Sequence, residues 1–197
     1  MLKRTFDIFF SLTSLIILLP FYIIIGILVY TDSKGPVFYR QIRVGKNNIN
    51  FKLFKFRTMH INADKQGLLT VGNRDARITK TGYWLRKYKI DEMPQLINVL
   101  IGDMSFVGPR PEVRKYVDLY QNEQLLVLSA KPGITDLASI EYRNENEILA
   151  KYEDPEKAYI NIVMPQKLSL NLTYIRNRTM LLDLKIILKT LSAVINP

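Results

Sequence analysis

The sequence contains no cysteine and a single histidine, His60. The lack of cysteine excludes a disulfide scaffold, a cysteine nucleophile and a thiolate zinc site. With one histidine, the chain cannot build a zinc site from several histidines, nor a Ser-His-Asp triad that does without His60. No internal repeat, low-complexity tract or interdomain linker is visible, and the length of 197 residues suits one ordinary domain with a short appendage.

Acidic residues are few relative to basic ones. The chain has 28 Lys and Arg against 18 Asp and Glu, a net charge of +10, with the basic excess concentrated in residues 31–60 and 74–89. This balance predicts an anionic partner, which is nucleic acid, a phosphate-rich substrate or an acidic membrane surface. Hydrophobic residues make up 48% of the sequence, so a packed core is feasible and general disorder is excluded.

A run of 23 residues without a charge, Ile8 to Tyr30, lies near the N-terminus. A helix of this length measures about 34 Å at about 1.5 Å per residue, and the hydrocarbon core of a bilayer is about 30 Å thick, so the segment can enter a membrane. It exceeds the apolar region of a signal peptide, about 7–15 residues, and no small-x-small cleavage site follows it. We therefore expect a membrane helix rather than a cleaved signal peptide.

Two arrangements of this helix are open. Pro20 lies in the middle of the run, where it removes a backbone donor and kinks a helix. Basic residues flank both ends, and the positive-inside rule keeps such flanks in the cytoplasm. A helix bent at Pro20 that enters and leaves the same membrane face satisfies both observations. On the residues alone, a single Pro-containing spanning helix is about equally favoured.

The remainder of the chain is expected to be mostly helical with a small β element. Strand-forming residues on both sides of a Gly-Lys-Asn-Asn turn predict a β-hairpin over residues 36–59, and Lys-Pro-Gly at 131–133 predicts a loop. Capping residues and apolar periodicity predict five helices. The first helix is capped by Thr81 and runs through Tyr88, and the second is capped by Asp91 and covers Glu92–Leu100. The third begins at Pro111 and runs through Tyr120. The fourth is Glu156–Asn177, with an interruption near Pro165, and the fifth is the amphipathic helix Met180–Ile195.

Asp91 and Glu92 are adjacent acids at the expected start of a helix, where backbone amides and the helix dipole stabilise anions. An ionised Asp can act as a nucleophile toward phosphorus, and a neighbouring Glu can hold Mg²⁺. The ordinary alternative is that Asp91 is an N-cap and Glu92 a favourable first-turn charge. For the pair taken alone, this structural interpretation is the more frequent one.

Two basic motifs suit phosphate oxygens. The sequence Lys-Phe-Arg-Thr-Met at residues 55–59 places Lys55 and Arg57 near a turn, although basic residues on an edge strand usually face solvent. In Gly-Pro-Arg-Pro at residues 108–111, two prolines restrict the backbone around Arg110, which favours bidentate phosphate recognition. The alternative is a helix-initiating loop in which Arg110 pairs with Glu112 or another surface acid.

Arg86 and Asp183 are each open to two interpretations. Arg86 precedes the acid pair, and it either meets an anionic lipid headgroup or belongs to a solvated basic face. Asp183 lies within the apolar pattern of the last helix. It either forms a buried ion pair with a residue of a basic motif or lies on the polar edge of the helix.

The segment from Lys89 to Glu112 closely resembles the bacterial sugar transferase family, the small monotopic phosphoglycosyl transferases. The residues and their spacing match together, from the acid pair to the Gly-Pro-Arg-Pro turn. The resemblance covers nearly the whole chain through four shorter matches, which are Lys3–Asp7, Lys55–Met59, Lys131–Thr135 and Leu182–Ile186.

This resemblance implies transfer of a sugar-1-phosphate from a UDP-sugar to a polyprenyl phosphate such as undecaprenyl phosphate, with release of UMP. Asp91 corresponds to the nucleophile that forms a phosphosugar-aspartyl intermediate, and Glu92 to the acid that helps to bind Mg²⁺. The other residues that we place at the site by this match are Lys55, Arg57, Pro109, Arg110 and Pro111 around the substrate, Arg86 near the lipid phosphate, Asp183 as a brace, and Pro20 as the break of a re-entrant helix.

On this basis we expect an α+β, mostly helical fold with amphipathic interfacial helices. Residues 1–31 form a re-entrant membrane helix, and residues 32–197 form a catalytic domain on the cytoplasmic face of the bacterial inner membrane. Besides the two substrates, we expect membrane lipid as a partner, and we do not expect nucleic acid. A homodimer is possible. The competing functions are a membrane-tethered basic protein that binds nucleic acid and a structural assembly module, both of which the charge permits.

Three departures from the family pattern concern this chain. Leu19 precedes Pro20 where the family often has Ser, and Asn171 stands where many members have Asp. Asp-Leu-Ala-Ser at residues 136–139 replaces the Gly-Trp-Ala-Gln of many members. The sequence therefore does not predict the sugar, the glycan pathway, the polyprenyl length or the oligomeric state.

Overall fold

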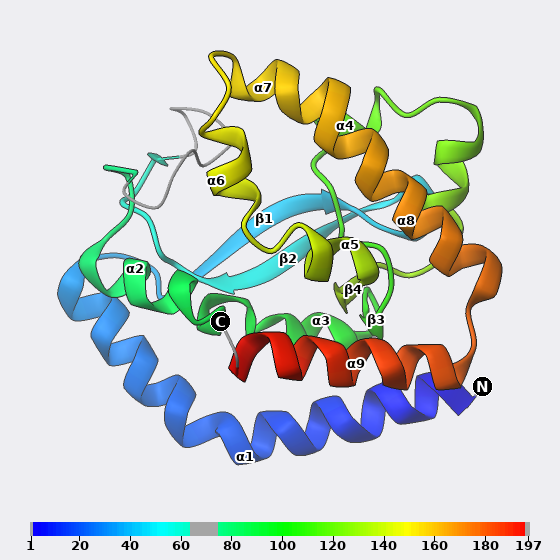
Figure 1. Ribbon diagram of the computed structural model, residues 1–197. Helices are drawn as coiled ribbons and strands as arrows, with labels where there is room; N and C mark the ends of the chain where they lie inside the picture. The colour runs from blue at the N-terminus through cyan, green and yellow to red at the C-terminus, as the bar shows by residue number, and fades with distance from the viewer. Residues whose placement is uncertain (1, 64–74, 196–197) are drawn as a thin grey trace.

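The computed structural model describes residues 2–63 and 75–195, and it is mostly helical with two small two-stranded sheets (Figure 1). This confirms the expected α+β class. Arg74, at the edge of the second basic stretch, lies outside the described residues.

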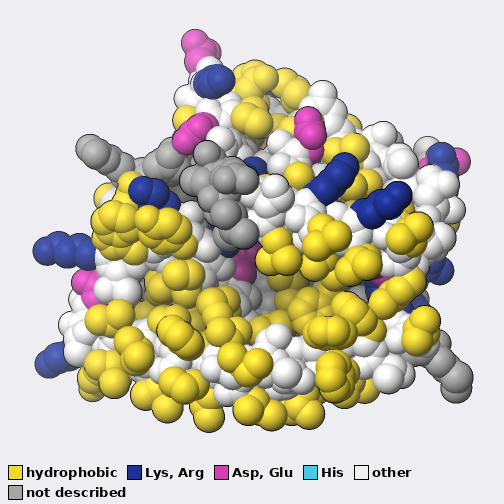
Figure 2. Space-filling view, turned by 60° about the horizontal axis from the view of Figure 1, so that its bottom comes forward, with side chains coloured by type: hydrophobic (Ala, Val, Ile, Leu, Met, Phe, Trp, Pro, Cys, Tyr) yellow, Lys and Arg dark blue, Asp and Glu magenta, His cyan; other side chains and the backbone are white. Residues whose placement is uncertain are grey.

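Helix α1, Leu2–Asp32, is the one described helix that is long and apolar enough to cross a membrane. It contains Pro20, runs along one side of the molecule next to α9, and changes direction near its middle (Figure 1). Most of its large apolar side chains are exposed, as are several from α9, Met180–Ile195. We call this surface of α1 and α9 the apolar face. Figure 2 shows it covered with hydrophobic side chains.

The beginning of α1 is attached to the rest of the chain by three charged side chains. Lys3 Nζ forms an ion pair with Asp183 Oδ2 at 2.5 Å. Arg4 donates to the carbonyl oxygens that end α3, one of them Val99 O at 2.6 Å. The buried Asp7 accepts hydrogen bonds from Ser105 Oγ and from the backbone amide of Phe106. These residues therefore hold the N-terminal end of the helix against the body of the protein.

The other end of α1 is attached as well. Asp32 Oδ2 accepts a hydrogen bond from Thr81 N at 2.7 Å. The buried Arg57 donates to Lys34 O at 3.1 Å and to Ser33 O, just beyond the helix. Both ends of α1 thus bind the same body of residues.

The predicted β-hairpin is confirmed. Strands β1, Phe38–Val44, and β2, Asn50–Phe56, pair antiparallel with Phe38 opposite Phe56, and the short 3₁₀ helix η1, Lys46–Asn48, makes the turn. The buried Asn98 side chain accepts from Phe54 N and donates to a β2 carbonyl. It therefore fixes helix α3, Gln95–Ile101, beside the hairpin.

Three predicted helix starts are wrong. Helix α2, Lys80–Lys87, is capped by Thr79, whose hydroxyl accepts from Gly82 N. Thr81 lies within the first turn, where its amide has no partner inside the helix and donates to Asp32. Asp91 caps no helix, since it lies in a separate 3₁₀ turn, η3, Ile90–Glu92, and α3 begins after Pro94. The helix expected from Pro111 is only α4, Arg114–Val117, because the preceding residues remain extended.

A second sheet was not predicted. Strand β3, Ser105–Val107, pairs parallel with β4, Gly133–Thr135, where a loop was expected. A Cβ on Gly108 would lie 2.3 Å from Lys131 O, and one on Gly133 would lie 2.1 Å from Gly108 N. The two backbones approach this closely only because both residues are glycine.

The rest of the chain forms a helical layer over the hairpin (Figure 1). The predicted interrupted helix is confirmed, because a π-helical turn, η5, separates α7 from α8 just before Pro165, and α9 is confirmed too. Between β4 and α7 lie two short helices, and an eight-residue 3₁₀ helix precedes β4. The remaining elements are η4 Asn122–Ser129, α5 Leu137–Glu141, α6 Glu145–Leu149, α7 Pro155–Ala158, η5 Tyr159–Val163 and α8 Met164–Asn177.

Candidate active site

Three separate elements bring a carboxylate and two cations together. Glu92 in η3 accepts a hydrogen bond from Lys55 Nζ of β2 at 2.9 Å. It also accepts from both terminal nitrogens of Arg110, one of them at 3.1 Å, in the loop that follows β3. Asp91, the neighbour of Glu92, is 6% exposed. The residues singled out in the sequence as acid pair, basic strand and Pro-Arg-Pro turn therefore form one cluster.

The turn that carries the acid pair is built by its flanking residues. Lys89 adopts a left-handed conformation with φ 57°, which is uncommon for a residue with a side chain. Tyr22 of α1 donates its hydroxyl hydrogen to Met93 O at 2.8 Å. Pro94, the first residue after this contact, is the N-cap residue of α3. The acid pair is thus held between the membrane helix and α3, with α2 on its other side.

Pro109 and Pro111 are buried on either side of Arg110. Gly133 N donates to Pro109 O at 3.0 Å, which ties the loop to β4. Because proline fixes φ, the backbone has little freedom at these positions. The guanidinium of Arg110 is therefore presented to Glu92 from a rigid loop, and it pairs with Glu92 rather than with Glu112.

The electrostatics separate the two acids. Burial by itself raises the pKa of Glu92, but the charges of Arg110 and Lys55 and their hydrogen bonds hold this pKa well below its ordinary value. Burial raises the pKa of Asp91, and the charge of Glu92 adds to this, while Lys55, Arg86 and Lys89 oppose it. Glu92 is therefore the ionised partner of the cations, and Asp91 is the more basic carboxylate.

The cations respond to the same surroundings. Burial lowers the pKa of Lys55 although Glu92 counteracts it, and burial also lowers the pKa of Lys89. The charge of Glu92 raises the pKa of Arg110. The cluster can therefore bind a further anion without a surplus of negative charge of its own.

Of the other expected site residues, Arg86 lies near the acid pair, whereas Arg57 and Asp183 form their contacts elsewhere. Arg86 of α2 is half-buried, and its charge acts on Asp91. Arg57 points away from the cluster and binds the end of α1. Asp183 forms the ion pair with Lys3 and accepts a hydrogen bond from Tyr174 at 2.7 Å. Among the residues that the structure describes, Arg57 and Asp183 make no ion pair or hydrogen bond to the acid pair.

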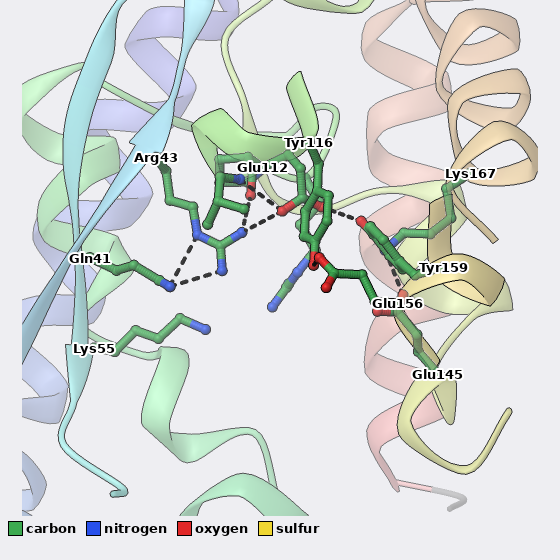
Figure 3. A network of polar contacts seen from close by, with 12 residues as sticks. Gln41, Arg43, Lys55, Glu112, Tyr116, Glu145, Glu156, Tyr159 and Lys167 are labelled. Carbon is green, nitrogen blue, oxygen red and sulfur yellow. Dashed lines mark hydrogen bonds and ion pairs between the residues drawn. The ribbon is translucent and has the colours of Figure 1, made fainter. Parts of the chain in front are cut away.

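A second polar network adjoins the cluster and was missed from the sequence. Arg43 of β1 pairs with Glu112 at 2.9 Å and donates twice to Gln41, and Glu112 accepts from the hydroxyl of Tyr159 (Figure 3). Arg43 also donates to Pro111 O at 3.1 Å. Through this hydrogen bond, the network holds the backbone of the loop that carries Arg110. The one sequence feature that could have indicated this network is the spacing of Gln41 and Arg43, which places both side chains on the same face of the hairpin.

The acids present fit Mg²⁺ only together with a substrate. No group of three or more possible metal ligands occurs in residues 2–63 and 75–195. Mg²⁺ is commonly held by one or two carboxylates plus substrate phosphate oxygens. Glu92 provides one such carboxylate beside the nucleophile candidate Asp91, so the residues fit a magnesium ion that arrives with a diphosphate.

Next to the apolar face, near the middle of the view in Figure 2, the surface is hollowed, and acidic side-chain atoms are visible inside the hollow. Trp84 of α2 and Tyr88, which follows the helix, are exposed aromatic residues whose rings stack, with Lys87 Nζ over both rings. Polar chemistry thus opens onto a surface whose composition is typical of a membrane interface.

The model of the bacterial sugar transferase family matches residues 1–197. The chain belongs to the bacterial sugar transferase family. Among its relatives, a UDP-glucose:undecaprenyl-phosphate glucose-1-phosphate transferase of Klebsiella pneumoniae is 38% identical over 192 residues, 95% of this chain. A UDP-N-acetylgalactosamine-undecaprenyl-phosphate N-acetylgalactosaminephosphotransferase of Aeromonas hydrophila is 33% identical over 197 residues, 98% of this chain.

This sugar transferase spans 39% and 44% of the length of those two relatives. By contrast, it covers 92% of the exopolysaccharide production protein PSS of Rhizobium leguminosarum bv. phaseoli, to which it is 37% identical over 196 residues, 96% of this chain. The first two relatives carry different sugars in their names. Family membership therefore leaves the sugar open.

Proposed function

We propose that this chain transfers a sugar-1-phosphate from a UDP-sugar to a polyprenyl phosphate such as undecaprenyl phosphate and releases UMP. This is a first membrane step of glycan assembly, such as exopolysaccharide synthesis. The observation that carries the proposal is the buried Asp91 beside the cluster of Glu92, Lys55 and Arg110. It combines a nucleophile with cations that suit a diphosphate, as the relatives' named reactions require.

In the first step, a carboxylate oxygen of Asp91 attacks the phosphorus that bears the sugar. A bond forms between this oxygen and phosphorus, and the bond from phosphorus to the oxygen that bridges the two phosphates breaks. UMP leaves with that oxygen and its electron pair. The product is a phosphosugar-aspartyl intermediate.

In the second step, an oxygen of the polyprenyl phosphate attacks the same phosphorus. The bond to Asp91 breaks, and the aspartate carboxylate is regenerated. The product is a polyprenyl-diphosphate sugar. We assign the lipid phosphate to Arg86, which is half-buried on α2 and whose charge acts on Asp91.

Lys55 and Arg110 stabilise the phosphate oxygens in both steps. They are held by Glu92 before substrate binds, so their donors need little reorganisation. Glu92 would help to hold Mg²⁺ when the diphosphate is bound, and the ion would supply charge neutralisation for the attack of one anion on another. Asp91 must be ionised to attack. Lys55, Arg86 and Lys89 favour that form, while burial and the charge of Glu92 leave the pKa of Asp91 raised.

We also propose that α1 is re-entrant and that the body lies on the cytoplasmic side of the bacterial inner membrane. In support, Arg4 binds Val99 O at one end of the helix and Asp32 binds Thr81 N at the other. A straight helix of 31 residues would separate its ends by about 46 Å at about 1.5 Å per residue. The bend near Pro20 instead lets both ends reach the same body.

The test uses the full chain in detergent or nanodiscs with Mg²⁺, undecaprenyl phosphate and a panel of UDP-sugars. We expect UMP release with at least one sugar and, with labelled donor alone, a covalent adduct on the peptide that contains Asp91. The substitution Asp91→Asn should abolish both, because an amide lacks the anionic oxygen. Near-normal turnover of this variant, with an adduct elsewhere, would contradict the assignment.

The same preparation distinguishes the competing functions. A structural assembly module releases no UMP with any donor. A nucleic-acid-binding protein retains DNA or RNA on a filter with an affinity that falls steeply as salt is raised.

A further inference from the structure

Asp136 is completely buried and lies at the junction of β4 and α5. One carboxylate oxygen accepts a hydrogen bond from Ser139 N and so caps α5. The other oxygen, Oδ2, accepts from the backbone amide of Arg110 at 2.5 Å. A single side chain thus joins the first turn of α5 to the loop that presents Arg110.

Capping alone does not explain this residue. Serine and asparagine cap helices about as well as aspartate does, and each needs only one oxygen for the purpose. A buried carboxylate costs free energy unless it is paired or hydrogen-bonded. Among the described residues, Asp136 forms no ion pair with Lys or Arg. Its second oxygen therefore requires another use, and the amide of Arg110 is the group that it binds.

The topology explains why the two residues meet. Strands β3 and β4 are parallel, with Val107 opposite Thr135, so the segments that leave their carboxyl ends lie side by side. Arg110 follows the first strand by three residues, and Asp136 follows the second directly. The hydrogen bond between them closes this edge of the small sheet.

We infer that Asp136 is a positioning residue, which sets the direction of the Arg110 side chain toward Glu92 and the substrate diphosphate. The inference rests on the proposed function, because it assigns Asp136 a role through a phosphate-binding arginine. Among the described residues, Asp136 makes its side-chain hydrogen bonds to Arg110 N and Ser139 N and none to Glu92. The Asp-Leu-Ala-Ser segment, in which this chain departs from many family members, thereby acquires a structural role at the active site.

The experiment is a double-mutant cycle that measures the dissociation constant of UDP in the presence of Mg²⁺, so that inactive variants remain measurable. Asp136→Ser retains a cap for Ser139 N but is too short to bind the amide of Arg110 as well. Asp136→Asn keeps the size of the side chain but offers one oxygen, and it serves if the serine variant does not fold. Each is compared in the native background and with Arg110→Ala, and unfolding temperatures are recorded throughout.

We expect Asp136→Ser to weaken UDP binding about tenfold or more in the native background, since a hydrogen bond to a charged group contributes that much. With Arg110→Ala, the further change should be under about twofold, because the lost bond then has no arginine to direct. The matched control is Asp154→Asn, which alters the N-cap of α7 at Lys157 N, bound at 3.0 Å, and should leave UDP binding unchanged.

Equal losses in both backgrounds would overturn the inference, because Asp136 would then act independently of Arg110. Unchanged UDP affinity in folded Asp136 variants would overturn it too. If the native chain itself binds no UDP, the proposed function fails, and the positioning role fails with it. UDP binding by the native chain therefore tests the proposed function, and the comparison of the Asp136 variants with it tests the positioning role.

Discussion

Arg110 donates through both terminal guanidinium nitrogens to the two carboxylate oxygens of Glu92. Such a bidentate pair fixes the plane of the guanidinium as well as its position. Lys55 binds the same carboxylate at 2.9 Å. Glu92 therefore holds two cations at one carboxylate.

This geometry predicts that Arg110→Lys is not a conservative change. Lysine keeps the charge but loses the planar fork, so two directed hydrogen bonds become one point contact. One charge-assisted hydrogen bond contributes about 1.5–3 kcal/mol, so kcat/KM for UMP release should fall about tenfold or more. Lys157→Arg, a change at an exposed lysine of α7, is the control. Unchanged kinetics of Arg110→Lys would place this residue outside the site.

The opposite pKa directions of the acid pair predict a pH effect of Glu92→Gln. Burial and the charge of Glu92 both raise the pKa of Asp91, and the nucleophile works only when ionised. Activity should therefore rise as pH increases through this raised pKa. Removing the negative charge of Glu92 lowers the pKa of Asp91, so the acid limb of the pH–rate profile should move to lower pH, at a reduced maximal rate. A shift to higher pH would contradict the coupling of the two carboxylates.

On the alkaline side, burial lowers the pKa of Lys55. Activity should fall as Lys55 loses its proton, below the pH at which a solvated lysine would. In Lys55→Arg, which stays charged, this alkaline limb should move to higher pH. An alkaline limb that does not move would assign it to another group.

The attachment of both ends of α1 predicts that its topology depends on Pro20. The chain has no cysteine, so a cysteine at Leu2, which is 73% exposed, gives a single labelling site. In intact cells it should be protected from an impermeant reagent and become accessible only after permeabilisation. Pro20→Leu favours a straight helix, so labelling from outside should increase. Outside labelling of the native helix would instead indicate a single-pass anchor.

The single tryptophan, Trp84, reports on the proposed membrane interface. It is 54% exposed on α2. Addition of vesicles that contain brominated lipids should quench its fluorescence, because a bound interface brings the indole to the headgroup region. The control combines Trp84→Phe with Tyr152→Trp, since Tyr152 lies in the segment between α6 and α7, opposite α1 (Figure 1). Equal quenching of both proteins would contradict the proposed orientation.

Local sequence signals predicted elements whose stability is largely local. The hairpin has turn residues between two strand-forming segments, and α9 has a clear helical period, so both were found. The helix starts at Thr81 and Asp91 were wrong for different reasons. Asp32, remote in sequence, accepts from the amide of Thr81 within the first turn of α2, whereas Asp91 lies in η3 and Pro94 separates this turn from α3.

The parallel pair of β3 and β4 could not be read from three-residue strands that are 26 residues apart. In the site, the sequence placed Asp91, Glu92, Lys55 and Arg110 through their motifs, but not the supporting contacts. Arg43 and Asp136 act on the Arg110 loop from segments remote in sequence. The sequence around Arg43 or Asp136 does not indicate these contacts, because they form only when the two sheets pack together in the folded chain.

The ion pair between Lys3 and Asp183 also has a consequence for biosynthesis. The two residues are 180 positions apart, and Tyr174 and Val107 share the same contact. At about 5–20 residues per second, a ribosome takes about 10–40 s to make the chain between them. During this interval the N-terminal helix exists without its last partner. This attachment of α1 to α9 can therefore form only at the end of synthesis, after the contacts of Arg4 and Asp7 with residues made much earlier.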